Sequence, residues 1–234
     1  AEVLDKENWR KLAQSNYELI MNLTSDEVFH CYKEKIGVKV FLEDYAYLSQ
    51  LMINFYEITG EINFLNDAKK TTQKTWDLFY DKDSKILQKN PTKENDLFVS
   101  PIDISDHNIP NGNSIFLMNC KKLEAITGES KWQNIVKELT QSFHSFLNLH
   151  GPQMISYIKN LDMCETLTTF TFFGNTEKCK DLHQYVKNRY LKSSVLIYKK
   201  DPKESYLVVC KNQTCSNKMK NVDELKSVVK NYAI

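Results

Sequence analysis

The chain of 234 residues is long enough for one large or two modest domains, and its 41% hydrophobic and 12% aromatic content is sufficient for a packed core. Its charges nearly cancel at +1 and only Arg10 and Arg189 are arginines, which argues against a nucleic-acid-binding protein. No stretch reaches roughly 18 consecutive apolar residues and the N-terminal residues lack a signal-peptide pattern, so we expect a cytoplasmic protein without a membrane span.

Apolar residues at helical spacing predict helices through the first two-thirds of the chain. Gly60 and Gly128 follow two of these helices as C-terminal stops, and Ser130 with Gln133 forms a capping-box pattern at the start of the last one. We expect the helices around Trp9 to Ile20, over residues 44–59, from Phe64 to Phe79, over residues 113–127, and from Trp132 to Leu147.

These helices form an internal repeat. The run ITGE at residues 58–61 recurs at residues 126–129, and Phe64 corresponds to Trp132 at the same offset. Such self-similarity is typical of helical hairpins that stack on one another. Asn8 and Trp9 resemble the start of the second helix of each hairpin, so we expect a fragment whose first helix exposes apolar residues. We predict an incomplete α/α toroid over residues 1–162.

The connections at residues 23–40 and 81–110 are long, and long ordered loops are uncommon without a functional purpose. In the first of them, apolar residues alternate around Gly37 as in a small hairpin. After Gly151 the composition changes to short β-branched and aromatic runs separated by helical patterns. We predict a small β-α-β-β-α module over residues 163–234, packed on the helical body.

Four runs occur in order along the chain and resemble successive signatures of one family. They are residues 41–47 (FLEDYAY), 56–60 (YEITG), 110–114 (PNGNS, preceded by Asp106) and 209–215 (VCKNQTC). On these runs the sequence resembles the thioredoxin-domain-containing family of the YyaL and spermatogenesis-associated type, across nearly its whole length. The resemblance implies a six-hairpin α/α toroid related to N-acylglucosamine 2-epimerases and six-hairpin glycosidases. It also implies a partner, an N-terminal thioredoxin-like domain, that this sequence lacks.

Two acidic residues open the helix predicted over residues 44–59. Glu43 and Asp44 can cap free N–H groups there, because carboxylates are favoured at the positive end of a helix. Alternatively, Asp44 points into the toroid cavity as a catalytic acid or base. Tyr45 and Tyr47 would then bind a sugar, and His30 in the preceding loop is a further ligand-binding candidate.

A second polar group precedes the helix at residues 113–127. Asp106 and His107 are candidate catalytic residues, because a histidine flanked by carboxylates can transfer protons at neutral pH. Asn113 and Ser114 can hydrogen-bond a sugar, and their alternative role is to cap the helix. His107 is not part of the family signature and can equally be a histidine of a surface loop.

The six cysteines contain no Cys-x-x-Cys pair, and only Cys210 and Cys215 lie close in sequence. These two are either a redox pair that works with the thioredoxin domain or two loop thiols that never bond. No spacing typical of metal ligands or of a nucleotide-binding loop is present, so we expect no metal and no cofactor.

Two classes of function therefore stay open. The first is an enzyme of the sugar epimerase, isomerase or glycosidase kind, with a small carbohydrate bound in the toroid cavity and with the isolated fragment inactive. The second is a non-catalytic scaffold that binds a ligand or partner and works with the thioredoxin domain. Because one fold hosts many functions, the sequence does not choose between them.

Overall fold

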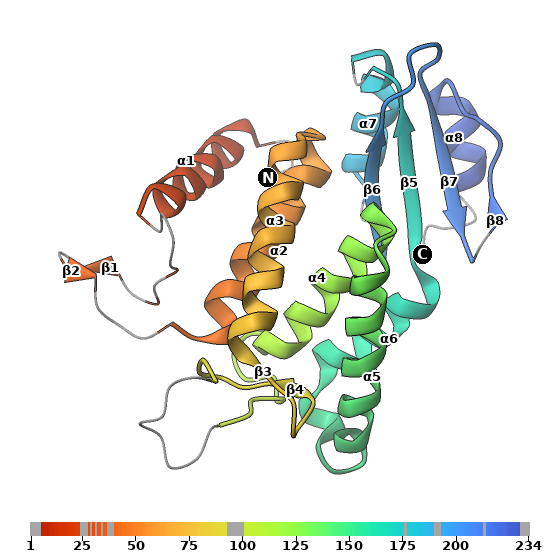
Figure 1. Cartoon of the computed structure of the whole chain (residues 1–234). Helices are drawn as coiled ribbons and strands as arrows, with labels where there is room; N and C mark the ends of the chain where they lie inside the picture. Colours follow the sequence, from red (N-terminus) through yellow and green to blue (C-terminus); the bar gives the residue numbers. More distant parts are fainter. Residues whose placement is uncertain are drawn as a thin grey trace. The chain divides into compact units, whose positions relative to one another are not determined.

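The computed structural model describes residues 6–23, 28, 30, 32–33, 35–36, 40–92, 101–175, 177–189, 193–212 and 214–229. The protein is mainly helical and contains one small mixed sheet (Figure 1). Its contacts divide it into two units. The helical unit holds the described residues of Asp26–Tyr56 and Glu61–Cys164. The sheet unit holds α1 (Glu7–Leu23), Glu57–Gly60 and the described residues from Glu165 onward.

Two helical hairpins make up most of the helical unit, and they confirm the predicted helices. The first hairpin consists of α2 (Leu42–Thr59) and α3 (Ile62–Phe79), and the second of α4 (Gly112–Thr127) and α5 (Ser130–His150). Gly60 and Gly128 end α2 and α4 with φ angles of 74° and 70°. Residues with a side chain disfavour this left-handed conformation. The repeated glycine therefore allows the tight turn between the two helices of each hairpin.

The hairpins are joined by polar and aromatic contacts. The side-chain amide of Asn119 in α4 donates a hydrogen bond of 2.8 Å to the Ala46 carbonyl in α2. Lys69 of α3 forms an ion pair with Glu129 at the start of α5. Apolar residues fill the space between these contacts, and the largest fully buried side chains of this unit include Trp132, Tyr45, Tyr157, Phe79, Phe116 and Phe143.

The start of α5 differs from the prediction. Ser130 is the first helical residue, and Glu129 occupies the N-cap position without a side-chain hydrogen bond to the helix. The predicted capping box of Ser130 and Gln133 is therefore wrong. The carboxylate of Glu129 instead forms ion pairs with Lys69 and Lys131.

Several elements of the helical unit were not predicted. The hairpin of β3 (Tyr80–Asp81) and β4 (Ile86–Leu87) follows α3, and Ile86 and Leu87 are fully buried. A 3-10 turn (Gly151–Gln153) and α6 (Ile155–Thr166) follow α5. Tyr157 of α6 is fully buried against Phe143, so α6 covers part of the apolar face of α5.

The loop before α2 contains a small hairpin, as predicted, but in a different register. Strands β1 (Tyr32–Lys33) and β2 (Lys35–Ile36) pair with Tyr32 opposite Ile36, so the turn precedes Gly37. Gly37 itself, and Cys31, lie outside the described residues.

The sheet unit confirms the predicted β-α-β-β-α order and adds one strand. Its elements are β5 (Thr168–Phe173), α7 (Lys180–Lys187), β6 (Ser194–Lys199), β7 (Tyr206–Lys211), β8 (Thr214–Cys215) and α8 (Val222–Val229). The sheet has the order β6-β5-β7-β8, in which β5 runs parallel to β6 and antiparallel to β7. Helices α7 and α8 contribute Leu182, Val186, Leu225 and Val229 to an apolar core with residues of β5 and β7.

Two turns of the sheet unit follow from local chemistry. Asn221 caps α8 by accepting from the N–H of Glu224 at 3.0 Å, and Glu224 accepts from the backbone N–H of Lys220, as in a capping box. Gly174 ends β5 with a φ of 87°, and a Cβ atom there would lie 2.2 Å from the Glu204 carbonyl. Only glycine fits this turn.

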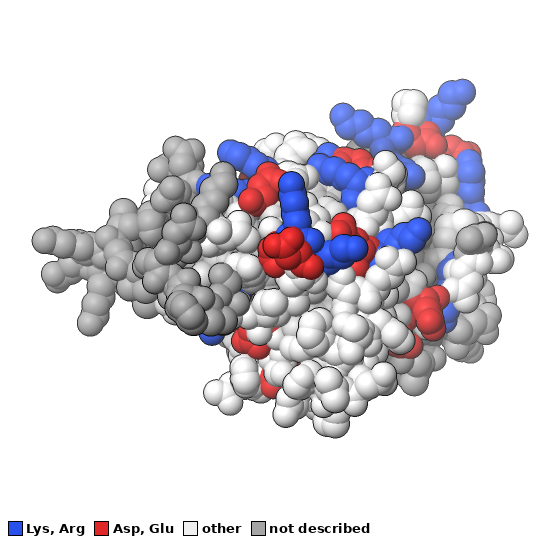
Figure 2. All heavy atoms as spheres, turned by 60° about the horizontal axis from the view of Figure 1, so that its bottom comes forward, with Lys and Arg blue, Asp and Glu red and all other residues white. Residues whose placement is uncertain are grey.

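The face of the molecule drawn in Figure 2 is of mixed charge. On this face, lysine and arginine side chains lie beside aspartate and glutamate side chains. Helix α1 leaves large apolar side chains exposed, as expected from the sequence, and these are Trp9, Leu12, Leu19 and Ile20. None of the helices in the described ranges has the length and apolar character of a membrane span.

Candidate functional site

The first polar cluster of the helical unit lies at the N-terminal end of α2. Asp44 Oδ2 accepts a hydrogen bond of 2.8 Å from the backbone N–H of Phe41, so its carboxylate caps the helix. The same carboxylate meets the imidazole of His30, whose Nδ1 lies 3.0 Å from Oδ1 and 3.1 Å from Oδ2. The ring of His30 also packs edge-on against Phe41. The structure thus joins two predicted site residues that are 14 positions apart in sequence.

The His30–Asp44 pair is partly exposed, so a ligand can reach the imidazole. The His30 side chain is 43% exposed and the Asp44 side chain 18%. A carboxylate beside Nδ1 favours the tautomer that carries its proton on Nδ1, which leaves a lone pair on Nε2. His30 is therefore oriented as a group that can take up a proton.

A second cluster is built around Asp106 in the loop before α4. Its Oδ1 accepts from the backbone and side-chain amides of Asn111 at 3.1 and 3.0 Å. Its Oδ2 accepts from the Ser156 N–H at 2.7 Å, at the first turn of α6. The Asp106 carboxylate thus fixes the turn of the loop before α4. It also caps the N-terminal end of α6, whose positive dipole end stabilises the negative charge.

Asn111, Asn113 and Ser114 are buried and hydrogen-bonded within the fold. Asn111 caps α4 by accepting from the Ser114 N–H at 2.9 Å. Asn113 is fully buried, accepts from Leu87 N–H at 3.1 Å, and donates to the carbonyls of Leu87 and Asp103 at 2.9 and 3.0 Å. These contacts tie α4 to the β3–β4 hairpin. The N-cap residue is Asn111, so the alternative in which Asn113 and Ser114 cap the helix is wrong.

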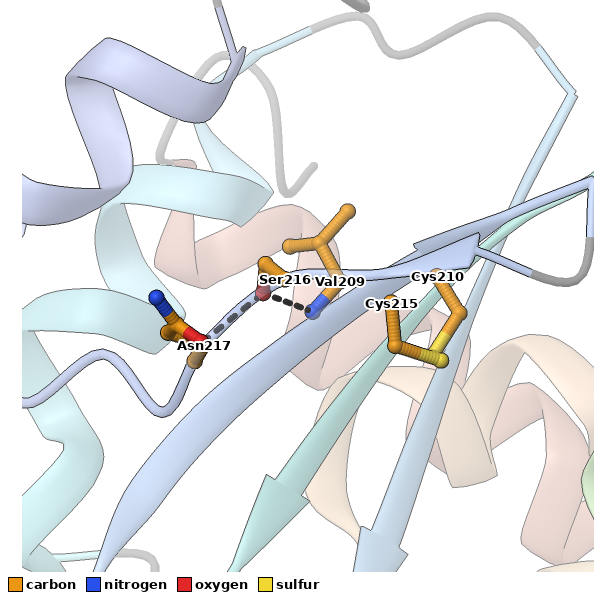
Figure 3. The surroundings of a disulfide bond; sticks show 5 residues. All are labelled: Val209, Cys210, Cys215, Ser216 and Asn217. Atoms are coloured by element: carbon orange, nitrogen blue, oxygen red, sulfur yellow. Dashed lines mark hydrogen bonds between the residues drawn. A yellow bond between two sulfur atoms is a disulfide. The ribbon is translucent and has the colours of Figure 1, made fainter.

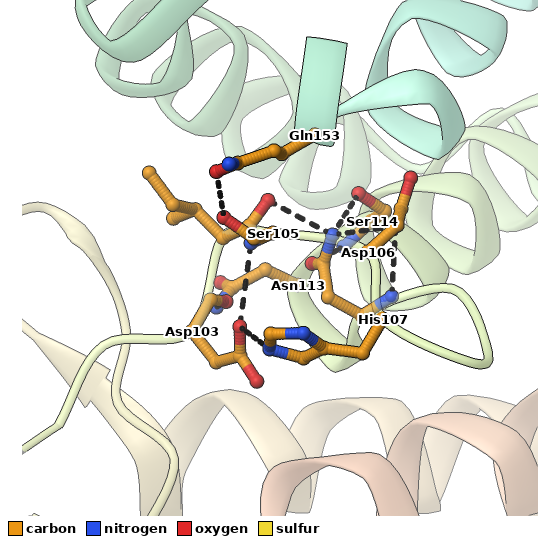
Figure 4. Close-up of polar contacts among 9 residues, drawn as sticks. Asp103, Ser105, Asp106, His107, Asn113, Ser114 and Gln153 are labelled. Atoms are coloured by element: carbon orange, nitrogen blue, oxygen red, sulfur yellow. Dashed lines mark hydrogen bonds and ion pairs between the residues drawn. The ribbon is translucent and has the colours of Figure 1, made fainter. Parts of the chain in front are cut away.

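His107 lies at the outer side of this loop. Figure 4 shows its ring turned toward Asp103, and the His107 Nε2 to Asp103 Oδ1 distance is 3.7 Å. The His107 side chain is 73% exposed. Figure 4 also shows Gln153 reaching the hydroxyl of Ser105, at 3.3 Å. The three predicted catalytic residues therefore do not converge on one another. Asp44 contacts His30, Asp106 is held by Asn111 and Ser156, and His107 faces Asp103.

Tyr47 connects the two clusters. Its hydroxyl donates to the Pro110 carbonyl at 3.0 Å, which links α2 to the loop that carries Asp106. Burial raises the pKa of the Tyr47 hydroxyl, and the carboxylates of Asp106 and Glu43 raise it further. Tyr45, by contrast, is almost fully buried and packs against Phe79, so its ring belongs to the core.

The N-termini of α2 and α4 approach closely at Gly112. A Cβ atom on Gly112 would lie 2.9 Å from Leu42 Cγ and 3.1 Å from the Glu43 nitrogen. Oε2 of Glu43 is buried and has no hydrogen-bond donor among the described residues. A buried carboxylate oxygen without a donor is unfavourable, so Glu43 is a candidate acceptor for a hydroxyl group of a ligand.

Sequence reasoning missed two residues that organise this region. Asn111 makes four side-chain hydrogen bonds, including one to the Ile104 carbonyl, and Asn160 of α6 donates to the Ser114 carbonyl at 2.6 Å. The signal for Asn111 was present, because an asparagine three residues before Ser114 is a typical N-cap. No sequence signal identified Asn160, whose partner is 46 positions away.

The structure joins Cys210 and Cys215 in a disulfide (Figure 3). The alternative that Cys210 and Cys215 are two loop thiols that never bond is therefore wrong. Across the described ranges, no three His, Cys, Asp or Glu side chains are grouped in a way that could hold a metal ion.

No protein-family model matches the chain, and no match is found among curated proteins.

Proposed function

We propose that the helical unit acts on a small carbohydrate, with His30 and Asp44 as the proton-transferring pair. The reaction class is that of a sugar isomerase or epimerase, in which a base removes a proton from the carbon beside a carbonyl group. The observation that carries the proposal is the contact of His30 Nδ1 with both oxygens of Asp44, at 3.0 and 3.1 Å.

This contact suits proton transfer in two respects. Asp44 orients the imidazole and stabilises the imidazolium that forms when Nε2 takes up a proton. Asp44 also keeps its orientation, because the Phe41 N–H holds the same carboxylate at 2.8 Å. The half-exposed ring of His30 stays accessible to a ligand while its partner is fixed to α2.

Neighbouring groups suit a hydroxyl-rich ligand. Glu43 follows Leu42 at the start of α2, next to Asp44, and its Oε2 needs a donor that the described residues do not supply. A sugar hydroxyl that reaches this buried oxygen on binding is such a donor, and a hydrogen bond from a hydroxyl to a carboxylate is stronger than one between neutral groups. Tyr47 lies one turn further along the helix, where its ring can contact the ligand.

The finer architecture is part of the same proposal. The repeat of two hairpins with the same glycine turn supports an α/α toroid as the description of the helical unit. We extend the proposal to the relationship with the thioredoxin-domain-containing family of the YyaL type, for which the four sequence runs are the support. In such a toroid a small carbohydrate is the expected ligand, and a thioredoxin-like domain the expected partner.

The experiment combines binding with proton exchange. Thermal unfolding is measured with a panel of aldoses and ketoses, and each sugar that stabilises the protein is then incubated in deuterated water. We expect deuterium at the carbon beside the carbonyl, detected by nuclear magnetic resonance. His30→Gln should reduce the exchange rate by at least about 100-fold, the lower range for loss of a general base. Asp44→Asn should reduce it too, while retaining an acceptor for Phe41.

Matched controls are available on exposed helix faces. His144→Gln in α5 and Asp77→Asn in α3 change the same residue types away from the site and should leave exchange unchanged. Stabilisation by no sugar would refute carbohydrate binding. Exchange that persists in His30→Gln would refute the assigned base.

A second candidate is a non-catalytic binding scaffold. It is favoured by the internal use of Asp106, Asn113 and Ser114, whose polar groups hold the loop and helices together rather than facing a ligand. Stabilisation by a sugar without deuterium exchange, lost in Glu43→Gln and retained in His30→Gln, would identify this function.

A further inference from the structure

The disulfide lies at the edge of the sheet, in the sheet unit and outside the proposed carbohydrate site. Cys210 and Cys215 are directly opposite each other in the antiparallel pair of β7 and β8, with their Cα atoms 4.0 Å apart. This is close to the spacing of a non-hydrogen-bonded antiparallel pair, so the bond forms between residues that the strand pairing already brings together. β8 has two residues, both exposed, and it is the last strand of the sheet.

Exposure distinguishes this disulfide from two other cysteines. Cys120 lies fully buried in the helical unit and Cys179 is buried in the core of the sheet unit. Burial raises the pKa of both thiols, which reduces the thiolate fraction that reacts with disulfides. The Cys210–Cys215 bond, by contrast, ends at an exposed residue of an edge strand, where an external thiolate can approach.

The segment that follows the disulfide is tied to β7 by backbone pairing. Ser216 N–H donates to the Val209 carbonyl at 2.8 Å, and the Ser216 hydroxyl accepts from the Val209 N–H at 3.1 Å (Figure 3). Leu207 and Met219 then exchange two backbone hydrogen bonds of 2.8 and 2.9 Å. The disulfide is thus the covalent end of a short ladder.

This ladder leads into the core. Met219 is buried and packs in the same apolar cluster as Leu225 and Val229 of α8. Because residues 216–221 connect Cys215 to α8, the bond limits how far the edge segment at residues 214–219 can open. Without it, the segment is held by the hydrogen bonds of Ser216 and Met219 and by the buried Met219 side chain. The pairing of Thr214 with Lys211 and the contacts of Lys218 with Glu204 and Tyr206 also remain.

We propose that Cys210–Cys215 is a thiol–disulfide exchange site that takes a dithiol reductant and controls opening of the edge segment at residues 214–219. A thiolate of the reductant attacks Sγ of Cys215, the S–S bond breaks, and Cys210 leaves as a thiolate. The second thiol of the reductant, as its thiolate, attacks the mixed disulfide and releases Cys215. The reductant leaves as its own disulfide, two electrons reduce the cysteine pair, and the two thiol protons pass to the cysteines.

The test uses the folded chain and dithiothreitol as the dithiol. The protein is treated without denaturant, its thiols are alkylated, and the modified cysteines are identified by peptide mass. We expect Cys210 and Cys215 to become alkylated together, and to re-form their bond in an oxidised glutathione buffer. A bond that resists the reductant until denaturant is added would make the disulfide a static crosslink and overturn the proposal.

Hydrogen–deuterium exchange measures the structural effect. Reduction should accelerate amide exchange at Leu207 and Met219 by up to about 30-fold, the factor that corresponds to loop-closure entropy for so short a ring. Amides that pair β5 with β6 should keep their rates. Cys215→Ser should show the fast exchange with or without dithiothreitol. Unchanged protection of Leu207 and Met219 after reduction would refute control of the edge segment.

Discussion

Replacing Asn113 by alanine tests whether this predicted sugar-binding residue acts within the fold. Its side chain is fully buried and makes three hydrogen bonds to backbone groups, two with Leu87 and one with the Asp103 carbonyl. A buried hydrogen bond contributes about 1 kcal/mol net, and a backbone group left without a partner costs about 1–3 kcal/mol. Since three groups lose their partner at once, we expect Asn113→Ala to lower the free energy of unfolding by about 3–5 kcal/mol.

Urea unfolding followed by far-ultraviolet circular dichroism measures this change, because the helical unit supplies most of the helical signal. Asn134→Ala is the matched control, since Asn134 lies on the exposed face of α5. We expect the control to stay within about 0.5 kcal/mol of the parent protein. Because the β3–β4 hairpin is held to α4 by these bonds, amide exchange at Leu87 should also accelerate in Asn113→Ala.

A loss below about 1 kcal/mol in Asn113→Ala would refute the reasoning. It would mean that water replaces the amide without penalty, as happens at a site open to ligand. Asn113 would then return to the ligand-binding role expected from the sequence.

Three further predictions concern single contacts. Gly174→Ala should destabilise the sheet unit by at least about 2 kcal/mol in thermal unfolding, because the φ angle is 87° and the new Cβ would lie 2.2 Å from a carbonyl oxygen, whereas Gly151→Ala meets open space and should change stability by less than about 1 kcal/mol. The hydrogen bond from Lys69 holds the pKa of Glu129 in the folded protein below its usual 4.5. The ion pair therefore stabilises the fold fully above pH 4.5, and this contribution is lost as the pH falls through the lower pKa of the folded state. In urea unfolding, the free energy of unfolding of Glu129→Gln should therefore fall less steeply with decreasing pH than that of the parent protein. The difference should be less than about 1 kcal/mol, because Lys69 and Glu129 are both partly exposed. Cys215→Ser should lower the free energy of unfolding by roughly 2 kcal/mol under oxidising conditions and abolish any effect of dithiothreitol on unfolding.

Each of these has a result that would count against it. Equal stability of the two glycine variants would mean that the turn after β5 relaxes around a side chain. If the free energy of unfolding of Glu129→Gln falls with decreasing pH as steeply as that of the parent protein, the ion pair with Lys69 does not persist in solution. A parent protein that unfolds identically with and without dithiothreitol would exclude a stabilising disulfide.

The helices of the two hairpins were predictable because their information is local. The spacing of apolar residues along residues 44–59 and 113–127, and the glycine after each, depend only on neighbours in sequence and on the conformational freedom of glycine. The same is true of the capping pattern at Asn221 and Glu224. The cap of α5 was mispredicted because the helix already includes Ser130, which leaves Glu129 at the N-cap position.

The candidate site was predictable by residue type but not by role. Asp44 is an acidic residue at a helix start whatever surrounds it, yet only the fold brings His30 to within 3.0 Å of it. Asp106 has the sequence context of a catalytic acid, and its environment makes it a cap for α6, a helix that no sequence pattern indicated.

By itself, the sequence determined the helical hairpins, the order of the sheet unit and the closeness of two cysteines along the chain, because propensity, periodicity and turn chemistry act over a few residues. The tertiary structure decided which polar groups satisfy one another. Asn113 has its partner Leu87 26 positions away and Asn160 has Ser114 46 positions away. A buried polar group is stable only with such a partner, and partners brought together across the chain cannot be identified from local sequence.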